Sequence, residues 1–222
     1  MAGELTALLA VRPGVTAVIG GGGKTTLLRT LARELQGRVI LCTTTRIYPF
    51  SEYPTGDFDA AALTQMLTAS PVVCVGAPAQ QGKLQAPTLP ISRLAELADY
   101  VLVEADGAKG LPLKAHAAWE PVIPAECENV ILVAGLSGLG QPIARACHRP
   151  ERYAALTACD QDSLVTPALA ATVIEKENLH HRVLLNQLDV LPDLAPAKEL
   201  ASCLTCPVAA GSLQKEWYLC LR

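Results

Sequence analysis

The chain has 222 residues, of which 50% are hydrophobic but only 4% are aromatic, and its net charge is −3. This length suits one α/β domain with an aliphatic core, and the slight negative charge gives no indication of a nucleic-acid or anionic-membrane partner. No apolar stretch is long enough to span a bilayer, and the N-terminal sequence lacks a basic patch followed by an apolar run. We therefore expect a cytoplasmic protein.

Short apolar runs alternate with helical patterns along most of the chain. The runs are rich in valine and isoleucine and are continuous, which is typical of strands buried on both faces of a parallel sheet. The predicted strands are residues 15–19, 38–43, 71–75, 100–104, 129–133, 182–185 and 207–209. The alternation predicts an α/β fold with an open, mainly parallel sheet flanked by helices.

The remaining segments indicate how the chain is organised. Helical spacing is predicted over residues 25–36, with Gly37 placed to end that helix. Residues 78–90 contain several prolines and predict a loop or a short hairpin. A helical pattern over residues 151–178, interrupted near Pro167, predicts a cap at about 145–180. We expect a single domain spanning residues 1–222.

The strand at 15–19 runs into a glycine-rich turn that opens the first long helix. The residues of this segment are Gly20, Gly21, Gly22, Gly23, Lys24, Thr25 and Thr26. Glycines let backbone N–H groups converge on an anion, and a helix N-terminus adds donors and a favourable dipole. We expect Lys24 to reach the β- and γ-phosphates, Thr25 to coordinate Mg²⁺ and Thr26 to bind the α-phosphate. The segment predicts a P-loop NTPase-like site for ATP or GTP, with Lys24 as a catalytic residue.

One position departs from the usual pattern G-x-x-x-x-G-K-[ST]. Counting back from Lys24 places Val18 where the first glycine belongs. The loop is either tightened, or the additional glycines supply the turn. The alternative interpretation is a glycine-rich turn between a strand and a helix that carries Lys-Thr by chance.

Acidic residues follow the strand at 100–104, at the end where ligands bind in open α/β sheets. We assign Asp106 to Mg²⁺ and Glu104 to a water or to the surroundings of the metal, and these two roles are exchangeable. Thr45, after the strand at 38–43, is a further candidate metal ligand. The alternative is that both carboxylates cap the following turn.

The strand at 182–185 is followed by Asn186-Gln187-Leu188-Asp189. In the N-K-x-D pattern of GTP-binding proteins, the aspartate accepts hydrogen bonds from guanine and the asparagine braces the loop. Asn186 and Asp189 are therefore candidate nucleotide-binding residues. Gln187 replaces the lysine, and Asn-x-x-Asp is also common in turns. The choice between ATP and GTP stays open.

The whole set of motifs resembles the YqeC family of selenium-dependent hydroxylase accessory proteins. The resemblance covers most of the chain, and its most distinctive block is Val-Glu-Ala-Asp-Gly-Ala-Lys-Gly at 103–110. The other matching segments are the glycine loop, Cys-Thr-Thr-Thr at 42–45, Leu-Pro-Leu-Lys-Ala-His at 111–116, Glu-Pro-Val-Ile-Pro at 120–124, His-Arg-Pro-Glu at 148–151 and residues 186–189. The resemblance implies an NTP-using step in the maturation of molybdenum hydroxylases that depend on selenium. The implied partner is such a hydroxylase or its cofactor precursor.

Basic residues in the same blocks suggest a second anion site. Lys109 and Lys114 lie on a loop punctuated by glycine and proline, and Arg145, His148 and Arg149 form another cationic cluster. Together they are candidates for binding a phosphorylated or oxyanion substrate. The alternative for each residue is a solvated charge or, for His148, a structural hydrogen bond.

Three functions are compatible with the sequence. The first is an NTPase or kinase-like phosphotransferase, and the second is a nucleotide-gated carrier or chaperone with little turnover of its own. The third is a thiol-based selenium carrier that uses Cys203 and Cys206, the CxxC pair among the eight cysteines. A single CxxC without further ligands is weak evidence for metal or redox chemistry, so we expect inert thiols.

Overall fold

The structure is a computed structural model that describes residues 4–222, which form two compact units. The first unit comprises residues 4–18, 27–107 and 122–129, and the second comprises 19–26, 108–121 and 130–222. The expectation about the N-terminal sequence concerns in part residues 1–3, which lie outside the described residues. The expectation of one domain spanning residues 1–222 stays a prediction.

The first unit is built on a run of parallel strands in the order β1-β8-β2-β5-β4. The same unit also contains a separate, small antiparallel sheet with the strand order β3-β7-β6. The strands are β1 (Gly14–Gly20), β2 (Val39–Thr43), β3 (Arg46–Ile47), β4 (Thr55–Gly56), β5 (Val72–Val75), β6 (Ala77–Pro78), β7 (Leu84–Gln85) and β8 (Tyr100–Glu104). The helices are α1 (Glu4–Leu8), α2 (Lys24–Glu34), α3 (Ala60–Ala69), α4 (Ile91–Leu97) and the 3-10 turn η1 (Gln80–Gly82).

The second unit contains the strand order β14-β13-β12-β10, which is parallel except for the antiparallel pair β13–β14. Its short strands β9 and β11 pair with each other. The strands are β9 (Leu113–Lys114), β10 (Cys127–Gly135), β11 (Cys147–His148), β12 (Arg182–Asn186), β13 (Val208–Ser212) and β14 (Trp217–Cys220). The helices are η2 (Leu136–Gly138), α5 (Ile143–Ala146), α6 (Pro150–Thr157), α7 (Pro167–Glu177), η3 (Leu188–Val190) and α8 (Ala195–Ser202).

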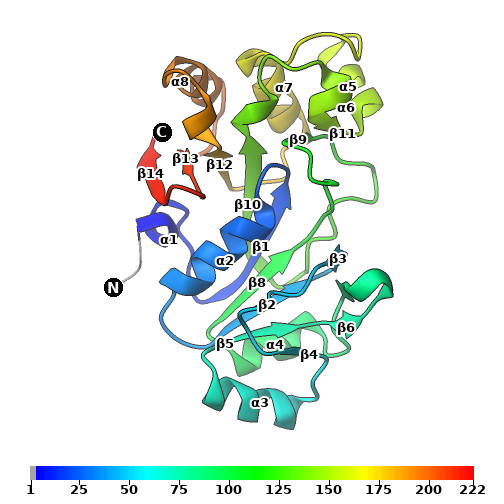
Figure 1. The fold of residues 1–222 in the computed structure, drawn as a ribbon, viewed down its shortest axis with the longest axis vertical. Coiled ribbons are helices and arrows are strands. Elements are labelled where there is room, and N and C mark those ends of the chain that lie inside the picture. The colour runs from blue at the N-terminus through cyan, green and yellow to red at the C-terminus, as the bar shows by residue number, and fades with distance from the viewer. Residues whose placement is uncertain (1–3) are drawn as a thin grey trace. The chain divides into compact units, whose positions relative to one another are not determined.

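The core of each unit is built mainly from aliphatic side chains, as expected from the low aromatic content of the chain. In the first unit, α3 and α4 lie against the strands (Figure 1), and Leu63, Leu67 and Leu94 from these helices pack on Val73 and Val101. In the second unit, α5, α6 and α7 lie side by side. The core strands are buried along almost their full length, which explains why their sequences are continuous apolar runs.

The fold class predicted from the sequence is confirmed: a large, open, mostly parallel sheet is flanked by helices. Each predicted strand is present, and the predicted helical segment at 151–178 divides into α6 and α7, with Pro167 opening α7. Residues 78–90 include the turn between β6 and β7, so the hairpin interpretation is the correct one. Among the helices formed by residues 4–222, none has the length and apolar character needed to cross a membrane.

Candidate functional site

The glycine segment forms a tight turn between β1 and α2, and protein atoms crowd it. Gly20, Gly22 and Gly23 have positive φ angles of 94°, 79° and 131°. A Cβ on Gly20 would collide with the carbonyl oxygen of Val133, and one on Gly22 would come within 2.5 Å of the Cα of Gly135. Glycine is therefore required here both by backbone conformation and by the close approach of β10.

Backbone hydrogen bonds fix the first half of this turn. The N–H of Gly21 donates to the oxygen of Val133 at 2.9 Å, and the N–H of Gly22 donates to the oxygen of Leu111 at 3.0 Å. Both amides therefore already donate to carbonyl oxygens of the protein. Their glycines shape the turn, and Gly22, Gly23 and Thr26 line the adjacent pocket described below.

Val18 lies inside β1, which continues as far as Gly20. Its side chain is fully buried, and its Cα is paired in register with Glu104 of β8. The strand thus passes through the position where the common pattern has its first glycine. The turn that follows the strand is formed by glycines, three of which, Gly20, Gly22 and Gly23, have positive φ angles.

Lys24 begins α2, and its ammonium folds back onto the glycine turn. The Nζ donates to the carbonyl oxygen of Gly20 at 2.7 Å, and the residue is only 6% exposed. Thr25 and Thr26 follow in the first turn of the helix and are half-buried. The N–H groups of a helix's first turn cannot be satisfied within the helix, and the dipole there is positive. This end of α2 is consequently suited to an anion.

Asn186, the last residue of β12, joins two loops. Its Nδ2 donates to the oxygen of Gly22 at 2.7 Å, and its Oδ1 accepts from the N–H of Leu213 at 3.0 Å. The side chain is buried. The candidate binding residue Asn186 thus holds the glycine turn against the loop that follows β13.

We expect Asn186→Ala to lower the free energy of unfolding by about 2–4 kcal/mol, because it leaves the partly buried oxygen of Gly22 and the buried N–H of Leu213 without their partner. Urea denaturation would measure the loss. Asn129→Ala, which removes one side-chain hydrogen bond of 3.2 Å to Leu9, is the comparison and should cost about 1 kcal/mol. Equal losses for the two variants would contradict the bracing role.

A pocket that is partly open to solvent, with about 510 Å³ of empty space, lies beside the glycine turn. Ser137 in η2, just after β10, donates its hydroxyl to the Oε1 of Gln187 at 2.7 Å on the wall of this pocket. The lining residues are Gly22, Gly23, Thr26, Ser137, Asn186, Gln187, Asp189, Val190, Ser212, Leu213 and Gln214. The structure therefore brings the glycine turn together with the Asn186–Asp189 motif, all within the second unit.

The predicted acidic residues lie in the first unit, at the end of β8. Glu104 is its last residue and Asp106 follows two positions later; both are buried, Asp106 completely. β8 ends at Glu104, and the backbone N–H of Ala105 still donates to the oxygen of Val18 of β1 at 3.0 Å. The hydroxyl of Thr43 donates to the oxygen of Glu104 at 2.8 Å and accepts from the N–H of Thr45 at 2.9 Å, which fixes the neighbouring end of β2.

The cationic cluster contains a carboxylate that sequence reasoning did not assign. Glu120 accepts from Arg149 at 2.8 Å and pairs with Lys114 at 3.3 Å, and the Lys114 side chain is fully buried. The Arg149 guanidinium also lies over the Trp119 ring, 5.4 Å from its centroid. His148 pairs in register with Lys114, and its pKa is lowered by burial and by the charges of Lys114 and Arg149.

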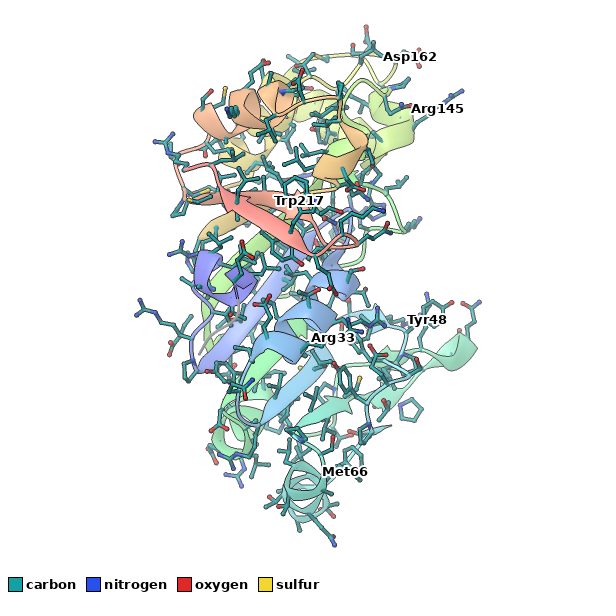
Figure 2. The ribbon with its side chains drawn as sticks, turned by 60° about the vertical axis from the view of Figure 1, so that its left-hand side comes forward. Arg33, Tyr48, Met66, Arg145, Asp162 and Trp217 are labelled. Carbon is teal, nitrogen blue, oxygen red and sulfur yellow. The ribbon has the colours of Figure 1, made fainter. Side chains whose placement is uncertain are left out.

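The proposed second anion site is thus partly occupied by the protein's own carboxylate. Lys109 is exposed and acts on His148 through its charge, while Arg145 of α5 extends away from the ribbon (Figure 2). The residues Lys114, His148 and Arg149 do lie together. Any anion bound there would share or replace Glu120 as the partner of two cations.

Glu120 should make stability depend on pH. Burial alone would raise its pKa, but the hydrogen bond from Arg149 and the charge of Lys114 lower the pKa from 4.5 to about 2. Because the folded pKa is depressed, the stabilisation is fully present above pH 4.5 and is lost as pH falls toward about 2. We expect Glu120→Gln to lower the urea midpoint near neutral pH and to approach wild type in acid. Glu126→Gln, at an exposed position, is the control. If the difference in urea midpoint between Glu120→Gln and wild type does not become smaller in acid, Glu120 does not stabilise the fold through its charge.

The His116 side chain anchors the same segment to α7. Its backbone N–H and its Nδ1 contact the two carboxylate oxygens of Glu177 at 2.6 and 2.7 Å, and both side chains are buried. No spacing in the sequence connects residues 116 and 177. This contact ties a segment rich in glycine and proline to α7.

All eight cysteines are free thiols. Burial raises the pKa of Cys42, Cys74 and Cys127, which favours inert thiols at these positions. Cys203 is exposed and Cys206 half-buried. Across residues 4–222, no group of three or more histidine, cysteine or acidic side chains is arranged to hold a metal ion.

Comparison with known proteins gives one consistent result. Residues 16–151 match the model of a protein family described as YqeC protein. The chain is also 39% identical over 163 residues to "Uncharacterized protein YqeC" of Escherichia coli (strain K12). This alignment covers 68% of the chain and 64% of the relative, so the chain spans less than two thirds of that protein's length.

Proposed function

This chain belongs to the YqeC family, and we propose that it is a magnesium-dependent nucleotide-binding protein whose residues 20–26 bind the phosphates of a nucleoside triphosphate. The observation that carries the proposal is the tight glycine turn that leads into the N-terminus of α2 and lines a pocket together with residues of the Asn186–Asp189 motif. A strand, a glycine turn and a helix opened by Lys-Thr supply the backbone donors and the cation that a phosphate requires.

The geometry narrows which groups would bind the phosphates. Since Gly21 and Gly22 donate to protein carbonyls, we assign phosphate binding to Gly23 and the first turn of α2. Lys24 would exchange its bond to the Gly20 oxygen for a bond to the β- or γ-phosphate. This exchange replaces a neutral acceptor with an anionic one, which strengthens the hydrogen bond.

We propose Mg²⁺ as the cation because it takes oxygen ligands and commonly binds through a hydroxyl or carboxylate together with substrate phosphates. The Thr25 hydroxyl is the ligand that we propose on the loop, and the ion would supply neutralisation of phosphate charge. Asp106, Glu104 and Thr45 as metal ligands or water-orienting groups stay predictions from the sequence. Asp106→Asn should reduce the magnesium dependence of nucleotide binding, and an unchanged dependence would exclude that role.

The reaction that we propose is NTP hydrolysis or phosphoryl transfer, in which Lys24 stabilises charge on the transferred group. The family resemblance supports a role in maturing selenium-dependent molybdenum hydroxylases. Steady-state phosphate release by the isolated chain would support the enzyme. If release appears only when a hydroxylase client is added, the nucleotide-gated carrier is the better description.

Isothermal titration of the full chain with ATP and with GTP, each with and without Mg²⁺, tests the proposal. Binding of at least one triphosphate that weakens when Mg²⁺ is removed is the expected result. If neither nucleotide binds in the presence of Mg²⁺, the proposal is wrong.

A further inference from the structure

We propose that the pocket beside the glycine turn selects guanine nucleotides and that Asp189 is the residue that reads the base. This inference rests on the proposed function and adds the class of nucleotide to it. It concerns residues of the second unit only.

The pocket places a carboxylate in the same enclosure as the phosphate-binding end of α2. Gly23 and Thr26 line it together with Asp189. Asn186 holds the glycine turn and Leu213 in a fixed relation, because it bonds to both. A nucleotide with its phosphates at Gly23 and Thr26 therefore has its sugar and base within a braced pocket that includes Asp189.

Asp189 has the chemistry to distinguish purines. It lies on η3 and is exposed, and among residues 4–222 its carboxylate has no hydrogen bond or ion pair. A carboxylate only accepts hydrogen bonds, and guanine presents two adjacent donors on one edge, the N1–H and the 2-amino group. Adenine presents an acceptor at N1, beside its single amino group, and would be repelled there. The site therefore favours guanine.

Gln187 supplies the complementary group. The hydroxyl of Ser137 donates to its Oε1 at 2.7 Å, so the amide oxygen is already engaged and the NH₂ group is what it can offer to a ligand. Guanine carries acceptors at O6 and N7. The exposed side chain of Val190, at 55% exposure, adds an apolar surface on the same wall for the face of a base.

The test is competition binding to the full chain in Mg²⁺ with GTP, ATP and xanthosine triphosphate. We expect GTP to bind at least about 100-fold more tightly than ATP. Guanine makes two charge-assisted hydrogen bonds to Asp189, whereas N1 of adenine is repelled by the carboxylate. Asp189→Asn should lose most of the GTP affinity and gain affinity for xanthosine triphosphate, since the asparagine NH₂ can donate to the carbonyl at C2 of xanthine. Asp162→Asn, on the exposed segment between α6 and α7 (Figure 2), is the matched control and should change nothing.

The outcomes separate this inference from the function on which it rests. Magnesium-dependent binding of ATP as tight as that of GTP, or an Asp189→Asn variant with an unchanged preference, would overturn guanine selection alone. If no triphosphate binds at all, both proposals fail. Circular dichroism of the Asp189→Asn variant would confirm that this exposed substitution leaves the fold intact.

Discussion

Replacing Lys24 with alanine should weaken nucleotide binding by roughly 100-fold or more, because hydrogen bonds between charged groups contribute about 1.5–3 kcal/mol each. Lys24 is 6% exposed and its ammonium bonds to the oxygen of Gly20 in the turn, from which it would exchange to a phosphate oxygen. The dissociation constants of the two proteins, measured by titration with GTP and Mg²⁺, give the effect directly.

The matched control is Lys198→Ala on α8, which removes an exposed lysine of the same unit. Its affinity should equal that of wild type, which would exclude a general effect of net charge. Micromolar affinity retained by Lys24→Ala would show that the glycine turn is not the phosphate site.

A second large effect is expected from Gly22→Ala, on stability. The new Cβ would lie 2.5 Å from the Cα of Gly135, and the backbone has a φ of 79° that alanine adopts at a cost. Strain of about 1–2 kcal/mol and overpacking of about 1–3 kcal/mol together predict a loss of roughly 3 kcal/mol. For a chain of this size that loss lowers the melting temperature by about 6–12 °C.

Gly140→Ala separates the two causes. Gly140 has nearly the same φ, 75°, but no atom within 4 Å of where a Cβ would stand. Gly140→Ala should therefore lower the free energy of unfolding by the backbone strain alone, about 1–2 kcal/mol. If the two variants melt at the same temperature, packing against Gly135 does not contribute to the requirement for glycine at position 22.

The fold could be predicted because each core strand has a recognisable local sequence pattern. Runs such as the one in β8 are continuous and apolar, and the helical spacing of α2 ends at a glycine. The short strands β3, β9 and β11 were not foreseen. Each has only two residues, too few to carry a pattern, and each forms because a distant segment pairs with it.

The glycine turn could be predicted from its residues, but the use of its amides could not. The bonds from Gly21 to Val133 and from Gly22 to Leu111 join segments about a hundred residues apart, and no local pattern encodes them. Glu120 was missed for a similar reason: it stands in a proline-rich segment, and its partner Arg149 lies on another loop. Asn186 illustrates the intermediate case, in which the motif indicated a brace and the structure identified what it braces.

The most direct test of the account is to follow the backbone amides of the ¹⁵N-labelled chain by NMR while GTP and Mg²⁺ are added. If residues 20–26 bind phosphate, the largest shifts should fall on Gly23, Lys24, Thr25 and Thr26, with smaller changes at Gly21 and Gly22, whose amides donate to the protein. Saturable nucleotide binding with these four amides unmoved would contradict the central claim.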